Sequence, residues 1–176
     1  MSITGTHDSL CAMASRVELR HRYPESLERI REVLTDPDYL RDKINAIGGL
    51  RAELVSREQD EHGITIVLHH AVPGDALPPL LRSARPEGLT IRRTEIWTDS
   101  GGSVYAVVDG LPGTITVGMH LEPDPTGCVL GAQLTAEVPL PLLSGKVEKM
   151  IVDNVAKLMA TEYQFTLDWL CDSAIP

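Results

Sequence analysis

Aromatic side chains are scarce in this sequence, at 4% of its 176 residues, although the hydrophobic share is an ordinary 43%. Leucine, valine and isoleucine must therefore fill most of the interior of the single domain that this length predicts. Basic residues are also few, since the formal net charge is −9. That charge argues against binding of nucleic acid, which needs a basic stripe, and against general adhesion to anionic lipid.

Long apolar runs are missing too, because none reaches the roughly 18 residues of a membrane-spanning helix. Residues 1–14 lack the basic start and apolar core of a signal peptide, so we interpret them as a flexible tail before one domain at residues 15–171. The cysteines, Cys11, Cys128 and Cys171, are odd in number and far apart. Neither a disulfide framework nor a zinc site is expected, and the cytoplasm is the simplest location.

Common catalytic and nucleotide-binding signatures are absent from the sequence. There is no Gly-x-Ser-x-Gly elbow, no phosphate loop and no dinucleotide fingerprint. His69 and His70 are adjacent on a predicted strand, so they face opposite ways and cannot readily share one metal ion. The sequence therefore predicts neither a metal site nor a cofactor.

What the sequence does contain is a long amphipathic segment near its C-terminus, residues 143–170. A rotation of about 100° per residue places a broad apolar stripe on one face of this helix. The stripe consists of Val147, Ile151, Val155, Leu158, Met159, Phe165, Trp169 and Leu170. Such a helix needs a large apolar partner surface, and Glu162 lies near the middle of the stripe.

The rest of the chain predicts a sheet that could provide this surface. Residues 16–23 alternate between apolar and polar, as in a half-buried strand. Two short helical patterns follow, the second with Asp36 as N-cap and Pro37 in its first turn. From residue 50 to 138 the period changes to two, and short turns separate six strands, which are therefore antiparallel.

The segment 73–86 interrupts these strands. It contains four prolines together with Leu77 and Leu81, which predicts a short helix or flap over one end of the sheet. The complete order is a strand, two short helices, six strands and a long helix. This order predicts an α+β fold in which a seven-stranded antiparallel sheet curves around the long helix.

Three stretches, residues 89–97, 138–149 and 160–169, together with this order, carry a resemblance to a known family. The chain resembles the helix-grip fold of the START-like (SRPBCC) superfamily, which includes polyketide cyclases and lipid-transfer proteins. Within it, the chain is similar to an uncharacterised actinobacterial family, a domain of unknown function, over about residues 15–171. The resemblance implies a buried pocket for an apolar small molecule or lipid, but neither a reaction nor a particular ligand.

Glu162 is the first candidate functional residue, because burial of an unpaired carboxylate is costly. One interpretation is a structural ion pair with a strand residue such as Arg93. The other is a polar group inside the cavity, which orients a ligand or acts as a general acid or base.

Arg93 and Glu95 share one face of a predicted strand with Trp97. Either both charged side chains point into the cavity with Trp97, or Ile96 defines the inner face. In the second arrangement, which is the commoner one, the two charges form an ion pair on the surface. His21 shares the apolar face of the first strand with Tyr23. A histidine at such a position is more often a hydrogen-bonded core residue, and the alternative is a role in catalysis.

Three functional hypotheses remain open. The first is a carrier or sensor of an apolar small molecule or lipid. Its predicted binding site is lined by Glu162, Val155, Leu158, Met159, Trp97, Arg93, His21, Tyr23, Leu77 and Leu81. The second is a cofactor-free cyclase, dehydratase or hydrolase in which Glu162, His21 and Glu95 transfer protons, to be discarded if Glu162 is merely paired with Arg93. The third is an interaction protein with a filled core. A homodimer joined through an edge strand is also compatible with the sequence.

Overall fold

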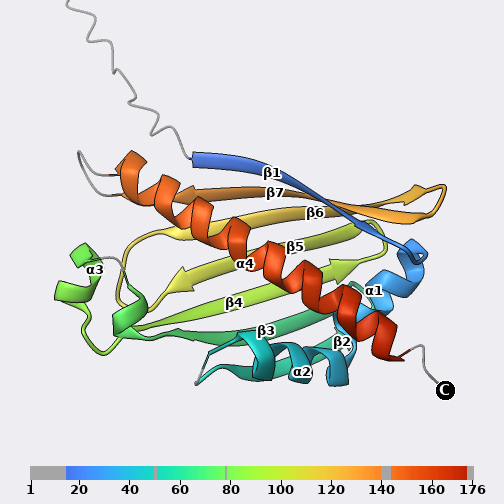
Figure 1. Cartoon of the computed structure of the whole chain (residues 1–176), viewed down its shortest axis with the longest axis horizontal. Helices are drawn as coiled ribbons and strands as arrows, with labels where there is room; N and C mark the ends of the chain where they lie inside the picture. The colour runs from blue at the N-terminus through green and yellow to red at the C-terminus, as the bar shows by residue number, and fades with distance from the viewer. Residues whose placement is uncertain (1–14, 50, 78, 140–143, 174–176) are drawn as a thin grey trace, which may run out of the picture.

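The computed structural model describes residues 15–49, 51–77, 79–139 and 144–173 (Figure 1). The elements are β1 (Ser15–Tyr23), α1 (Leu27–Thr35), α2 (Pro37–Ile47), β2 (Glu53–Asp60), β3 (Gly63–Val72), η1 (Gly74–Ala76), α3 (Pro79–Ala84), β4 (Leu89–Thr98), β5 (Gly101–Val108), β6 (Thr114–Asp124), β7 (Gly127–Glu137) and α4 (Ser144–Ser173). The α+β fold predicted from the sequence is confirmed. The predicted tail at residues 1–14 lies outside the described residues.

One antiparallel sheet contains all seven strands, in the order β1-β7-β6-β5-β4-β3-β2. Helix α4 crosses one face of this sheet diagonally, and α2 lies on the same face near the edge formed by β2 and β3 (Figure 1). The predicted flap is present as η1 and α3, at one end of the sheet. None of the described helices combines the length and the apolar character needed to cross a membrane.

Register explains which strand side chains face α4. Each residue in the middle of a strand is paired laterally with residues that point to the same face of the sheet. One such row across β2 to β7 is Leu54, Leu68, Arg93, Ala106, Ile115 and Ala136. Its apolar members are buried or half-buried, so Arg93 lies on the inner face with them.

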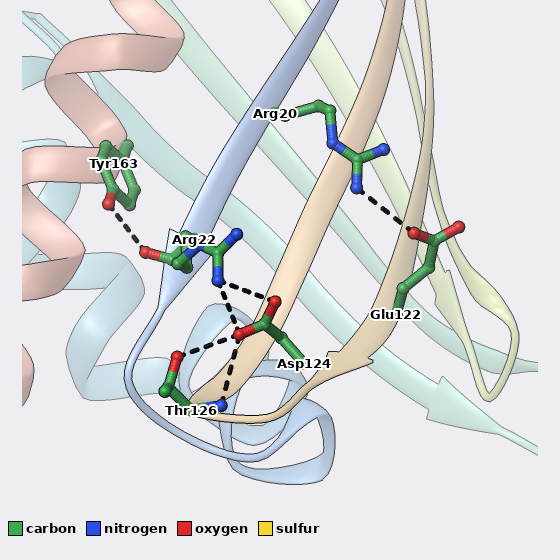
Figure 2. Close-up of polar contacts among 6 residues, drawn as sticks. All are labelled: Arg20, Arg22, Glu122, Asp124, Thr126 and Tyr163. Atoms are coloured by element: carbon green, nitrogen blue, oxygen red, sulfur yellow. Dashed lines mark hydrogen bonds and ion pairs between the residues drawn. The ribbon is translucent and has the colours of Figure 1, made fainter.

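The edge strand β1 is tied to the β6–β7 hairpin and to α4 (Figure 2). Arg22 Nη1 lies 2.7 Å from Asp124 Oδ1, and the same carboxylate accepts a hydrogen bond from the Thr126 hydroxyl at 2.9 Å. The Tyr163 hydroxyl of α4 donates to the backbone carbonyl oxygen of Arg22 at 2.7 Å. These contacts place the second half of α4 against β1.

The boundary between α1 and α2 follows the predicted signal. Asp36 Oδ1 accepts hydrogen bonds from the backbone amides of Asp38 at 2.8 Å and Tyr39 at 2.9 Å, and Pro37 opens α2. The first backbone amides of a helix have no partner within the helix, so this cap stabilises α2.

Replacing Asp36 with alanine is expected to lower the free energy of unfolding by about 1 kcal/mol, because two amide donors lose their acceptor. Urea unfolding would measure the loss. The control is Asp38→Ala, which removes an exposed pair with Arg41 and a carboxylate in the first turn of α2, and should cost about 0–1 kcal/mol. Equal or greater destabilisation by Asp38→Ala would contradict the role of Asp36 as the cap.

Candidate functional site

A cavity of about 220 Å³ lies between α4 and the inner face of the sheet. Val155, Leu158 and Met159 of α4 line one side of it. The opposite side is formed from β3 to β6 by side chains that include Ile91, Val104, Ala106, Ile115 and Val117, and the end of α2 closes the rim. Only two of its lining side chains are polar, namely His70 and Arg93.

A second, smaller cavity of about 40 Å³ lies beside the first, and its lining is rich in polar groups. Arg93 and Met159 line both cavities and therefore form part of the wall between them. The smaller cavity is lined by His21, Tyr23, Leu34, Tyr39, Lys43, Arg93, Glu95, Trp97, Met119, Leu130, Met159, Glu162, Tyr163 and Thr166. A polar space of this volume is large enough for a water molecule.

The largest concavity, a groove of about 730 Å³, lies outside the core near α1 and the β2–β3 turn. Its charged groups are largely engaged with the protein itself: Arg31 pairs with Asp99, and Arg57 Nε donates to the Thr35 carbonyl oxygen at 2.6 Å. Trp97 lines both this groove and the small inner cavity. We take the inner pair of cavities as the candidate site, because the apolar walls of the larger one hold a small apolar molecule better than the polar lining of the groove.

Arg93 is the centre of a buried charged cluster. Its Nη1 donates to Glu162 Oε1 at 2.7 Å and its Nη2 to Glu162 Oε2 at 3.4 Å. On the other side Arg93 Nε lies 2.9 Å from Glu95 Oε1, and Trp97 Nε1 donates to Glu95 Oε2 at 3.1 Å. The side chains of Arg93, Glu95 and Glu162 are 12%, 2% and 13% exposed. Of the two arrangements that the sequence left open, the inward one is present, because register turns both Arg93 and Glu95 towards the cavities.

The carboxylates in this cluster stay ionised at neutral pH. Burial alone would raise the pKa of Glu162, but the positive charges of Arg93 and then Lys43 outweigh burial and lower that pKa to about 2. The same two cations hold the pKa of Glu95 below its ordinary value, against the effect of burial. Lys43 is buried on α2, with its ammonium 5.4 Å from the centre of the Tyr39 ring. The positive charges of Arg93 and Lys43 therefore balance the negative charges of Glu95 and Glu162.

A hydrogen-bonded chain connects this cluster to α2. The Thr166 hydroxyl donates to the Glu162 carbonyl oxygen at 2.8 Å, and it also lies 2.8 Å from the Tyr39 hydroxyl. Since Thr166 has only one hydroxyl proton, Tyr39 is the donor between the two hydroxyls. The link fixes α2 against the part of α4 that carries Glu162.

His70 is the second polar side chain of the apolar cavity. It is 8% exposed, and its Nε2 has no hydrogen-bond partner among the described residues. Burial, reinforced by the charge of Arg93, lowers the pKa of His70 to about 4, so the ring is neutral at pH 7. A buried polar atom without a partner costs about 1–3 kcal/mol, which a bound molecule could offset.

The predicted lining residues divide between the two cavities. Val155, Leu158, Met159 and Arg93 line the apolar cavity, whereas Glu162, Trp97, His21 and Tyr23 line the polar one, with Arg93 and Met159 shared. Leu77 is buried but lines neither cavity. The side chain of Leu81 lies outside the described residues.

The three proposed proton-transfer residues all line the smaller cavity, where both carboxylates are paired with Arg93. His21 stacks on Tyr163, with ring centres 4.5 Å apart and planes 10° from parallel. Glu162 pairs with Arg93, as one interpretation of the sequence predicted, and Glu95 contacts the same guanidinium. An ionised carboxylate with a pKa of about 2 neither donates a proton nor serves as an effective base at neutral pH.

Sequence reasoning missed Lys43 and His70 as site residues, although both gave a signal. Lys43 follows Tyr39 by one helical turn, on the face that also contains Leu40. His70 continues the alternation of Ile66 and Leu68 along β3. Among the described residues, no group of three or more His, Cys, Asp and Glu side chains is arranged to hold a metal ion.

With this geometry in place, comparison with known proteins locates the chain in a family. Residues 18–170 match a family described as "Protein of unknown function (DUF2505)". The chain belongs to this family. It is also 24% identical to the uncharacterised protein Rv0481c of Mycobacterium tuberculosis and to Mb0491c of Mycobacterium bovis, in each case over 86% of this chain and 94% of the relative.

Solved structures show that this DUF2505 member shares its fold with other proteins. A START superfamily protein from Mycobacterium smegmatis matches 89% of this chain and 98% of its own, at 14% identity and a TM-score of 0.53. The di-domain ARO/CYC StfQ of the steffimycin biosynthetic pathway matches 92% of this chain and 52% of its own, at 14% identity and a TM-score of 0.65. At these identities the likeness shows the fold, so the helix-grip prediction is confirmed.

Proposed function

We propose that the protein binds a small apolar molecule, or the apolar part of a lipid, between α4 and the sheet, as a carrier or sensor. The observation that carries this proposal is the cavity of about 220 Å³, whose lining is apolar except for His70 and Arg93. Ligand sites typically combine apolar walls with a few polar groups that orient the ligand. The START superfamily protein and the ARO/CYC protein with the same fold give the proposal further support.

The alternative hypotheses have less support. The ion pair between Arg93 and Glu162 leaves no proton donor of suitable pKa at that position, which disfavours an enzyme. An interaction protein with a filled core does not explain the space beside Met159. Location in the cytoplasm and assembly into a homodimer stay predictions from the sequence.

Filling the cavity tests the proposed function. Val155→Phe adds bulk inside the cavity, so we expect it to weaken binding of the uncharged fluorophore N-phenyl-1-naphthylamine at least tenfold, or about 1.4 kcal/mol. Fluorescence titration would measure the affinity. Filling an apolar cavity also tends to stabilise a fold, so the melting temperature should not fall.

The matched control is Asn154→Phe, which adds a ring one residue earlier on α4, at an exposed position. It should leave probe binding unchanged. Native mass spectrometry followed by organic extraction would then show whether an apolar compound co-purifies with the protein and is lost from Val155→Phe. Equal binding by both variants would contradict the proposed site.

A further inference from the structure

His70 gives information about the chemistry of the ligand that the shape of the cavity does not. It lines the apolar cavity, is more than nine-tenths buried, and its Nε2 is unpaired within the described part of the chain. A neutral imidazole has one N–H donor and one bare acceptor nitrogen. An uncharged oxygen group on the ligand is therefore a suitable partner, and a hydroxyl suits either tautomer because it both donates and accepts.

The charged cluster holds two cations and two carboxylates, so its charges already balance without an anionic ligand. Both ends of the Arg93 guanidinium face carboxylates of the protein, Glu162 on one side and Glu95 on the other. Lys43 supplies the second positive charge, which balances the second carboxylate. A ligand carboxylate at this position would be the third buried anion against two cations, and uncompensated buried charge is strongly disfavoured.

We infer that the ligand is a neutral apolar molecule with one hydroxyl group. His70 binds this hydroxyl at the boundary between the apolar cavity and the charged cluster. This inference rests on the proposed function. The hydrocarbon part fills the space lined by Val155 and Leu158. The space is smaller than the roughly 300–1,000 Å³ typical of drug-sized ligands, which favours a single short chain or one or two rings.

The experiment compares three terminal groups on the same eight-carbon alkyl chain. 1-Octanol, octanoate and 1-chlorooctane would each be used to displace N-phenyl-1-naphthylamine from the wild-type protein at pH 7.5. We expect 1-octanol to displace the probe at the lowest concentration of the three. Octanoate binding as tightly as 1-octanol would overturn the inference while leaving the proposed function intact.

A pair of histidine variants separates hydrogen bonding from general apolar affinity. His70→Phe keeps a ring but removes both nitrogens, so we expect the affinity for 1-octanol to fall about five- to tenfold while that for 1-chlorooctane is unchanged. His69→Phe is the control, because His69 precedes His70 on β3 and faces the other side of the sheet.

Each outcome distinguishes the two proposals. An equal effect of His70→Phe on both compounds, or no effect on either, would show that His70 does not bind the hydroxyl and would overturn the inference. Should the wild-type protein bind neither the probe nor any member of the series, the proposed function itself would fail. The wild-type comparison does not depend on any variant folding correctly.

Discussion

Arg93→Met is expected to lower the free energy of unfolding by about 3–5 kcal/mol, the largest effect of any single change considered for this protein. The guanidinium lies between Glu95 and Glu162, and neither carboxylate is more than 13% exposed. Removing it leaves two buried negative charges with Lys43 as the nearest compensating cation. Urea unfolding at pH 7 would measure the loss.

The control for this experiment is the next residue on the opposite face of β4. Arg92 forms an ion pair with Asp109 at 2.8 Å, but both side chains are exposed, so Arg92→Met should cost about 0–1 kcal/mol. The combination of Arg93→Met with Glu162→Gln restores the balance of charge, with Lys43 opposite Glu95. The double variant should therefore be more stable than Arg93→Met alone, and the reverse order would contradict the charge-balance account.

Acidification is expected to destabilise the protein below pH 6.5, and His70 should account for the upper part of the loss. Its pKa is about 4 in the folded state against an ordinary value of 6.5. Between these values the unfolded chain binds a proton that the folded chain excludes, so stability falls as the pH falls. A pKa difference of that size corresponds to about 3 kcal/mol in the free energy of unfolding, and this contribution is fully lost by about pH 4.

Glu162 acts in the adjacent pH range. Its pKa is about 2 in the folded state, below the ordinary value of 4.5, so its contribution is lost as the pH falls from 4.5 towards 2. Urea unfolding at a series of pH values would separate the two groups. His70→Phe should reduce the dependence between pH 6.5 and 4 without abolishing it, because burial also lowers the pKa of His21. His69→Phe should retain the full dependence. An unchanged slope in His70→Phe would mean that another group titrates in this range.

If both predictions hold, the cluster has two roles that follow from the same charges. It holds α4 on the sheet through the Arg93–Glu162 pair, and it sets a charge-balanced polar boundary at one end of the apolar cavity. A ligand that brings no charge leaves this balance intact. Stability of the empty protein and selectivity for a neutral ligand would thus depend on the same residues.

The sequence alone determined the elements and their order. Alternation along β1, the Asp36-Pro37 boundary and the apolar stripe of α4 all depend on neighbours within a few residues in the chain. The first strand, predicted at residues 16–23, begins one residue earlier, at Ser15. Three residues of the apolar stripe, Val155, Leu158 and Met159, also line the cavity.

Only the tertiary structure decided where the charges go. A charged residue on a half-apolar strand can lie on the surface or pair inside the core, and its local sequence is the same in both cases. Arg93 faces inward because Leu68 and Ala106 flank it across the sheet, and its partner Glu162 is 69 residues away. Lys43 and His70 join the site from α2 and β3. The free energy of burying each charge depends on opposite charges that long-range packing brings within a few ångströms, and no local pattern contains that information.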